Sequence, residues 1–222
     1  MSASRIRDQD GWARRPGWPR RLVWLYGGLA GFGLSLALMV KARLGLDPWD
    51  VLHQGIARHL GIQIGWVVIG VSAVVLAAWI PLRQRPGVGT ISNAVVVGLV
   101  VNGALAVLPT PDALAPRLLL LAAAIVLTGL ATGCYLGAGL GPGPRDGLMT
   151  GLARRGHSVR LVRTAIEVSV LALGVILGGS VGIGTVAYAL AIGPLVHVFL
   201  PRLAVAVPAG QPPDDRGAPC RH

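Results

Sequence analysis

The sequence contains little charge, since only 13% of its 222 residues are Asp, Glu, Lys or Arg, against about 25% in soluble domains. It has two cysteines, Cys134 and Cys220, too few for a disulfide framework or a cysteine-based metal cluster. No Gly-x-Ser-x-Gly or His-Glu-x-x-His motif occurs, and His53 and His59 fall on opposite sides of a helix, which is poor geometry for a metal. We therefore expect no enzyme, no metal site and no cofactor.

Apolar residues, by contrast, make up 53% of the chain and gather in six windows. Each window is long enough to cross about 30 Å of hydrocarbon, which takes roughly 20 helical residues. A soluble protein with buried helices is disfavoured, because six such windows leave no polar face for water. The sequence thus predicts an all-α membrane protein with six transmembrane helices, at residues 22–41, 62–81, 91–108, 117–138, 159–178 and 183–201.

The formal net charge of +11 reflects membrane topology rather than nucleic-acid binding. If the N-terminus is cytoplasmic, 16 of the 20 Lys and Arg residues fall on the cytoplasmic side. This positive-inside distribution predicts that both termini are cytoplasmic. We expect the basic arm, residues 1–21 with interleaved Trp residues, to bind anionic lipid headgroups. The tail, residues 202–222, is rich in Pro, Gly, Asp and Arg without periodicity and is predicted to be disordered.

The chain contains an internal duplication. Residues 33–58 match residues 129–154 at 11 of 26 positions, and residues 61–102 match residues 156–197 at 12 of 42 positions. The shared Gly, Pro, Thr and Asp residues make the match convincing, because apolar composition alone cannot produce them. An internal repeat fixes the architecture, so it constrains every later inference.

Each copy of the duplication holds three of the six windows. Repeat one covers residues 22–108 and repeat two covers residues 117–201. Because three is an odd number, the second copy must enter the membrane from the opposite side, which makes an inverted-topology repeat. Many secondary transporters use this plan, and so do some scaffolds and channels.

A short segment in each repeat is typical of a helix start. Asp47 can act as the N-cap and Pro48 suits the first helical position, and Pro144 takes the same place in repeat two. The apolar spacing that follows is too short to cross the membrane, so it predicts an interfacial or re-entrant helix. Asp50 and Asp146 either cap these helices or line a polar path that binds a cation or a proton.

A Gly-x-Gly-Thr segment precedes the third window of each repeat. The threonines can cap the helices, and the glycines permit tight turns or close backbone approach. Gly98 and Gly193 follow at equivalent positions and predict close helix packing. The topology places each segment on the same membrane face as the Asp motif of the other repeat. The residues of the two segments are Gly87, Gly89, Thr90, Gly182, Gly184 and Thr185.

Polar residues inside the windows are candidates for ligand binding or ion coupling. Arg163 and Glu167 lie four residues apart in the fifth window and can pair on one helical face. Glu167 would lie near the bilayer centre, where a charge usually faces the bundle interior or a wet cavity. Repeat one has Ser72 at that position, so the pair is an asymmetric addition, either a structural lock or part of a site. Asn102 and His197 occupy equivalent places in the third and sixth windows, where packing roles are equally open.

Three strings of the sequence resemble the YczE/YitT-type family of bacterial integral membrane proteins, namely residues 45–55, 81–90 and 140–151. The resemblance covers about residues 22–201. It implies a multi-pass plasma-membrane protein of bacteria with no settled biochemical activity, so no catalytic residue can be carried over.

The inverted repeat favours a small transporter or permease of unknown substrate. Asp50, Asp146 and Glu167 would be its polar or ion-coupling residues, with Arg163 as the partner of Glu167. The alternative is a non-transporting scaffold or the substrate-capturing subunit of a larger membrane complex, acting with a partner subunit or as a homo-oligomer. A polar cavity that reaches the three carboxylates would favour transport, and a solid apolar centre would count against it.

Overall fold

The computed structural model describes residues 17–156 and 158–204, and this part of the chain contains helices and no strands. Most of the basic arm and nearly all of the tail lie outside the described residues, so the expected lipid binding and disorder stay predictions. The eight helices are α1 (Trp18–Ala42), α2 (Pro48–Leu60), α3 (Ile64–Trp79), α4 (Val88–Val107), α5 (Leu114–Gly137), α6 (Pro144–Ala153), α7 (Val159–Ile176) and α8 (Ile183–Leu203).

All six predicted windows coincide with helices, but four helices, α1, α4, α5 and α8, are long and apolar enough to cross a membrane on their own. Helices α2 and α3 count as a fifth span only when taken together, and they bend by 114° at their junction. Helix α7 includes Arg160, Arg163 and Glu167, and these charges lower its apolar character. The chain is therefore an all-helical membrane protein with four to five candidate spans.

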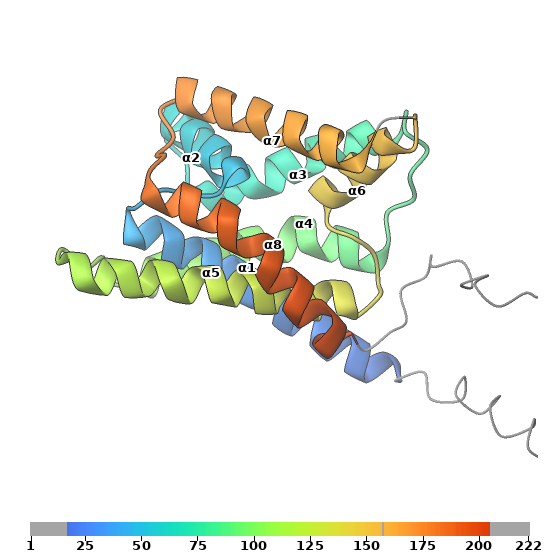
Figure 1. The fold of residues 1–222 in the computed structure, drawn as a ribbon, viewed down its shortest axis with the longest axis horizontal. Coiled ribbons are helices and arrows are strands. Elements are labelled where there is room, and N and C mark those ends of the chain that lie inside the picture. Colours follow the sequence, from blue (N-terminus) through green and yellow to red (C-terminus); the bar gives the residue numbers. More distant parts are fainter. Residues whose placement is uncertain (1–16, 157, 205–222) are drawn as a thin grey trace, which may run out of the picture.

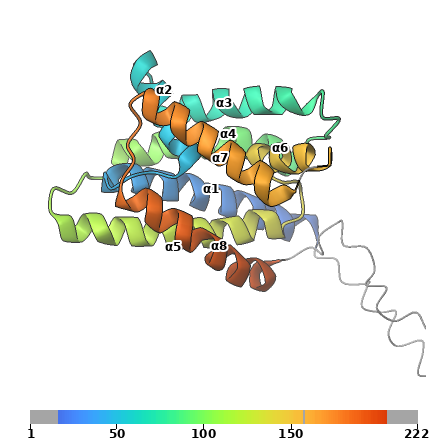
Figure 2. The ribbon, with the colours of Figure 1, turned by 45° about the horizontal axis from the view of Figure 1, so that its top comes forward.

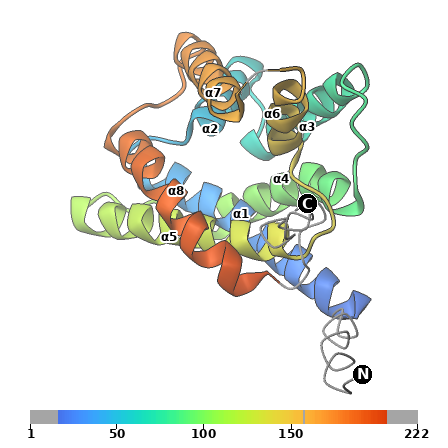
Figure 3. The same ribbon diagram turned by 45° about the vertical axis from the view of Figure 1, so that its right-hand side comes forward.

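The helices form two layers (Figure 1). The first layer holds the four long helices, in which α1 packs against α5 and α4, and α5 packs against α8. The second layer holds α2, α3, α6 and α7, in which α2 packs against α7 and α3 against α6. Packing of α3 on α4 joins the layers on one side, whereas α7 and α8 make no comparable contact on the other side (Figure 3).

The short helices α2 and α6 begin as the sequence predicts. An Asp47 carboxylate oxygen accepts a hydrogen bond from the Asp50 backbone N–H at 2.7 Å, and Pro48 is the first helical residue. Pro144 begins α6 directly after the Gly143 cap. At 1.5 Å per residue, both helices are too short to cross a bilayer. Both lie in the second layer, where α2 packs against α7 and α3, and α6 packs against α3 and α7.

The threonines of the Gly-x-Gly-Thr segments take part in capping their helices. Each threonine is the third helical residue, and its hydroxyl accepts a hydrogen bond from the N–H of the capping glycine. The distance is 3.2 Å for Thr90 and Gly87 and 3.3 Å for Thr185 and Gly182. The threonine thus supplies the reciprocal half of a capping box rather than the N-cap itself.

Each Gly-x-Gly-Thr segment packs against the connection that precedes the Asp motif of the other repeat. The Gly89 N–H donates to the Leu140 carbonyl at 2.9 Å, and the Gly184 N–H donates to the Leu44 carbonyl at 2.7 Å. A Cβ on the first glycine of either segment would lie 2.4 or 2.5 Å from the same carbonyl oxygen, so only glycine allows this approach. Each segment is therefore in direct contact with the connection before the Asp motif of the other repeat, and the shared membrane face stays a prediction.

Two arginines tie the ends of α1 and α5 together in the same way. The Arg21 guanidinium donates to two carbonyls after α5, at 2.9 and 2.8 Å. The Arg117 guanidinium donates to two carbonyls at the end of α1, at 2.8 and 2.7 Å. Each satisfies carbonyls that a helix C-terminus leaves unpaired. Since each arginine lies near the start of its own helix, α1 and α5 run antiparallel, side by side (Figure 2).

The contacts of α2 with α7 and of α6 with α3 use equivalent positions with exchanged side-chain sizes. In the first contact Gly174 packs on the α2 backbone at Val51, 2.7 Å from where its Cβ would be. In the second contact the small residue is Gly147, and a Cβ there would lie 1.9 Å from the Trp79 ring. Positions 51 and 147 are equivalent in the repeats, as are 79 and 174. The glycine is therefore on α7 in the first contact and on α6 in the second contact, although the two contacts use equivalent positions.

Candidate functional site

We call the side where α7 and α8 make no close contact the open side, and the side where α3 packs on α4 the closed side. A cavity of about 390 Å³ lies on the open side, lined by residues of α2, α5, α6, α7 and α8. A volume of this size is in the range of small-molecule sites. Its wall includes the aromatic residues Trp49, Tyr135 and Tyr188, together with apolar residues mainly from α8. Its polar and charged lining residues are Asp47, Thr132, Arg145, Asp146, Arg163 and Glu167.

The wall of the cavity holds an ion pair between the two Asp motifs, in which Asp47 is buried and Arg145 is half-buried. An Arg145 Nη donates to an Asp47 carboxylate oxygen at 3.2 Å, across 98 residues of sequence. The guanidinium carbon of Arg145 also lies 5.0 Å from the centre of the Phe32 ring, which is cation–π geometry. Asp47 therefore both caps α2 and holds Arg145, so its charge is already compensated.

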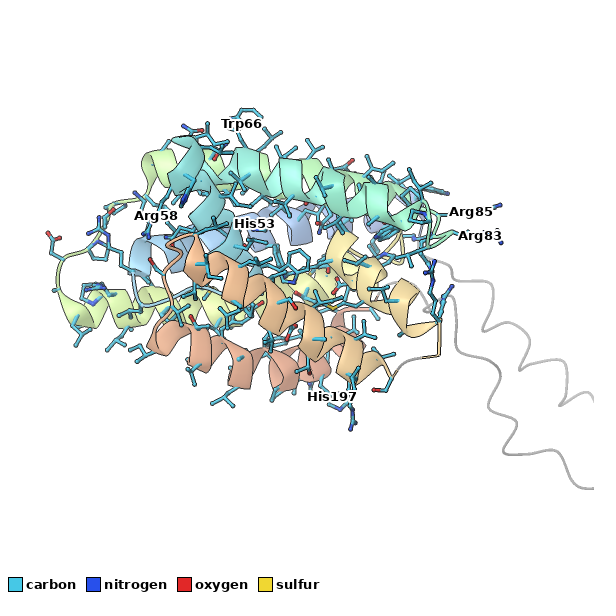
Figure 4. The ribbon with its side chains drawn as sticks, turned by 90° about the horizontal axis from the view of Figure 1, so that it is seen from above. His53, Arg58, Trp66, Arg83, Arg85 and His197 are labelled. Carbon is cyan, nitrogen blue, oxygen red and sulfur yellow. The ribbon has the colours of Figure 1, made fainter. Side chains whose placement is uncertain are left out.

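The two carboxylates that follow the prolines have different partners. Asp146 accepts a hydrogen bond from the Tyr135 hydroxyl at 2.8 Å, and this partner is neutral. Asp50 is buried and lies 3.0 Å from Nδ1 of His53, one turn further along α2. Figure 4 shows His53 inside the molecule, between the helices. Asp146 faces the large cavity without a guanidinium bonded to it, whereas Asp50 lines only a smaller one.

The smaller cavity, of about 40 Å³, lies on the closed side of the molecule. Trp49, Tyr135, Arg145 and Asp146 line both cavities, so the two are adjacent. At the position equivalent to Glu167 the smaller cavity has Ser72, and this substitution makes its wall less polar. The two cavities are equivalent places in the two repeats that differ in size and charge.

Arg163 and Glu167 form the predicted pair on α7. The Arg163 Nε donates to a Glu167 carboxylate oxygen at 2.9 Å, and the side chains are 57% and 34% exposed. Both side chains line the large cavity. Their partial exposure leaves them accessible to a solute that enters it.

The structure does not bring Asn102 and His197 into either cavity. The Asn102 side-chain oxygen accepts a hydrogen bond from the Gly65 N–H at 2.9 Å, which locks α3 to α4. His197 is exposed and points away from the molecule (Figure 4). Gly98 is packed as predicted, since a Cβ there would lie 2.4 Å from the Gly65 carbonyl oxygen, but Gly193 has nothing within 4 Å. Equivalent positions thus differ because α8 does not pack on α7.

Three contributors to the site escape a sequence search for paired acids. In the sequence Arg145 is one of many cationic residues that fit the membrane topology. The one sign of a further role is that the equivalent position in repeat one is Trp49. Tyr135 and Tyr188 lie inside apolar helices and are buried. The available signal was their scarcity, because the chain has only three tyrosines and buried tyrosine hydroxyls usually have a partner. Among the described residues, no group of three or more His, Cys, Asp or Glu converges as metal ligands.

Comparison with known proteins identifies related chains of undetermined function. Residues 19–201 match DUF6198, a family of unknown function. The chain is 40% identical over 200 residues to an uncharacterised protein of Haemophilus influenzae, covering 88% of this chain and 92% of that one. It is 32% identical over 186 residues to the uncharacterised membrane protein YczE of Bacillus subtilis, covering 82% and 86%. No solved structure matches it.

Proposed function

The chain belongs to the YczE-type membrane proteins of family DUF6198, and we propose that it is a small transporter of the bacterial plasma membrane. The observation that carries this proposal is the charged cavity of about 390 Å³ between the two layers. It reaches Asp146 and Glu167, two of the three carboxylates singled out in the sequence. A cavity with charged walls inside an apolar bundle is costly to maintain unless a polar solute uses it.

The matched contacts support an inverted-topology repeat. Arg21 and Arg117, the two Gly-x-Gly-Thr segments and the exchanged glycine contacts all obey the sequence offset of 96 or 95 residues. Because α1 and α5 are equivalent yet antiparallel, the axis that relates them is perpendicular to the helices. In secondary transporters with this plan, the substrate site lies near the interface between the repeats. The cavity has residues from both repeats in its wall.

Six spans with both termini in the cytoplasm fit this plan best. Helix α7 would then cross the membrane with Arg163 and Glu167 facing the cavity instead of lipid. The positions of three arginines support this orientation of the chain in the membrane. Arg83 and Arg85 lie at one end of the molecule and Arg58 lies at the other end (Figure 4). The first two belong to the cytoplasmic charge cluster and the third to the external side.

Cysteine labelling tests whether α7 crosses the membrane. Arg154→Cys and Val181→Cys are exposed positions on either side of it, to be made in a background with the native cysteines replaced by alanine. An impermeant maleimide added to intact cells should label position 181 directly, and position 154 only after the cells are permeabilised. Labelling of both positions from the same side would refute the six-span topology.

Reconstitution tests transport. Proteoliposomes incubated with a bacterial metabolite extract should accumulate a solute that protein-free liposomes do not, as measured by untargeted mass spectrometry. Asp146→Asn should abolish that accumulation while leaving expression and unfolding temperature nearly unchanged. If no solute accumulates, transport is wrong and a non-catalytic subunit of a larger complex becomes the better proposal. Only Val162 and Gly174 of α7 are buried. The apolar residues that α7 exposes would then be the place for a partner helix, and they include Leu161, Val168, Leu173, Val175 and Ile176.

A further inference from the structure

The charges that line the large cavity do not balance. Three carboxyl groups, those of Asp47, Asp146 and Glu167, face two guanidinium groups, those of Arg145 and Arg163. Asp47 pairs with Arg145 and Glu167 pairs with Arg163. This leaves Asp146, whose recorded partner is the neutral Tyr135 hydroxyl. The cavity therefore has an excess of one negative charge, and Asp146 carries it.

Aromatic residues line the same cavity as this carboxylate. Trp49, Tyr135 and Tyr188 line the cavity and are all at least nine-tenths buried. Aromatic faces attract cations through the quadrupole of the ring, and aromatic cages are a recurring way to bind ammonium groups. A chain with only 5% aromatic residues thus places three of them in the wall of the cavity that holds Asp146.

The size of the cavity and its hydrogen-bond donors further restrict the class of ligand that it can bind. A volume of about 390 Å³ is far larger than a bare inorganic ion needs, and the described acidic and histidine residues do not converge as metal ligands. The Trp49 indole N–H is buried and has no hydrogen-bond partner among the described residues. A buried donor of this kind calls for a partner, such as an oxygen of a bound solute.

We propose that the cavity binds a small organic ammonium cation, with its positive charge at Asp146 among the three aromatic side chains. This inference names the class of solute that the proposed transporter carries. Only the statement that the bound cation is also transported rests on the proposed function. A ligand oxygen would accept the hydrogen bond from Trp49. Each of the two arginines already bonds a carboxylate, which weakens its attraction for an anion.

Four probes of similar shape and different charge test the proposal on the unaltered protein in detergent micelles. They are choline, which is cationic; glycine betaine, which is zwitterionic; 3,3-dimethylbutanol, which is neutral; and 3,3-dimethylbutyrate, which is anionic. We expect choline to raise the unfolding temperature and to bind about tenfold more tightly than the neutral alcohol, which is about 1.4 kcal/mol, because a desolvated cation is attracted by aromatic faces and by the carboxylate. Equal binding of choline and the alcohol, stronger binding of betaine or the anion, or no binding of any probe would overturn it.

Two variants locate the charge that selects the cation. Asp146→Asn keeps an acceptor for Tyr135 and should abolish the preference for choline over the alcohol. Asp112→Asn removes the same charge from an exposed loop outside the cavity and should leave the preference intact. Because the four-probe series uses the unaltered chain, it tests the preference for a cation even if a variant misfolds. Binding of choline without flux into liposomes would refute transport alone, whereas flux of a solute without selective binding of choline would refute the ligand class alone.

Discussion

The two sides of the molecule are built from equivalent helices, yet one is closed and the other open. On the closed side α3 packs on α4 through Gly65, Gly98 and Asn102, whose contacts bring the backbones together. On the open side α7 and α8 carry Arg160 and His197 at the positions equivalent to Gly65 and Asn102, and the large cavity lies there. The substitutions that prevent close packing thus coincide with the place where charge can be exposed to a solute.

This difference shows how a duplicated frame can acquire a site. The residues that the repeats share, such as the Gly-x-Gly-Thr segments, form turns and interlayer contacts and keep the backbone frame. An arginine at position 160 cannot enter the space that Gly65 occupies, because a single Cβ there would already lie 2.1 Å from a backbone oxygen. The open side is therefore encoded in the sequence of α7. Arg145, Arg163 and Glu167, which line the cavity, are residues that the repeats do not share.

The largest effect is expected where the exchanged glycine contacts are disturbed. Gly147→Val should clash with the Trp79 ring, and Trp79→Gly should leave a void, each lowering the free energy of unfolding by about 3–5 kcal/mol. The double variant reproduces the small-and-large arrangement of the α2–α7 contact. It should be more stable than the sum of the single effects predicts, by about 1–3 kcal/mol.

Thermal and denaturant unfolding in micelles measures this coupling. The exchange between equivalent positions is the strongest sign that the two contacts are versions of one another. Strictly additive destabilisation in the double variant would show that positions 79 and 147 do not act as a pair, and the equivalence of the two halves would lose its best support.

Equivalent glycines on the two sides give the sharpest contrast in one substitution. Gly98→Ala puts a Cβ 2.4 Å from the Gly65 carbonyl oxygen and should cost about 2–3 kcal/mol of unfolding free energy. Gly193→Ala points into open space and should be neutral or stabilising by up to about 1 kcal/mol, because alanine favours helix. Unfolding midpoints of the two variants in the same detergent decide it. Similar losses at both positions would mean that α7 and α8 are packed in solution.

Much of the fold could be predicted from the sequence, because its strongest signals are local or repeated. The apolar windows, the Asp47–Pro48 helix start and the Arg163–Glu167 pair each depend on spacing along one helix. The pairing of motifs between halves followed from counting three windows per repeat. The openness of one side was not predicted, because Gly98 and Gly193 look alike in the sequence. What distinguishes them is the residue on the facing helix, Gly65 on α3 and Arg160 on α7, and the facing helix is known only from the structure.

The candidate site was predicted only in part for a related reason. Asp146 and Glu167 stand out as costly charges in an apolar chain, but the partners that define their electrostatics come from distant elements. Arg145 reaches Asp47 across 98 residues, and Tyr188 of α8 lines the same cavity. Asn102 looks like a functional amide in sequence, and its role as a packing lock appears only when Gly65 is placed beside it.

A smaller and equal effect is expected at the two ends of the α1–α5 contact. Arg21→Gln and Arg117→Gln each remove two charged hydrogen bonds to helix C-terminal carbonyls. Each should lower the free energy of unfolding by about 1–2 kcal/mol, since these bonds are partly exposed. The double variant should be additive because the ends are far apart, and Arg20→Gln at an exposed neighbour is the control. Unequal losses in unfolding experiments would indicate that the two halves differ here too.

The smallest effect on stability is expected at Glu167, where the effect on function should be large. Glu167→Gln keeps an acceptor for Arg163 in a partly exposed pair, so unfolding free energy should change by no more than about 0.5 kcal/mol. Uptake into proteoliposomes should nevertheless fall at least about tenfold, because the variant leaves Arg163 uncompensated and removes the excess negative charge of the cavity wall that attracts a cation. Ser169→Ala, on the same helix but outside the cavity lining, should preserve uptake. Full uptake by Glu167→Gln would mean that the charge added to α7 is a structural lock, and that the open side owes its function to Asp146 alone.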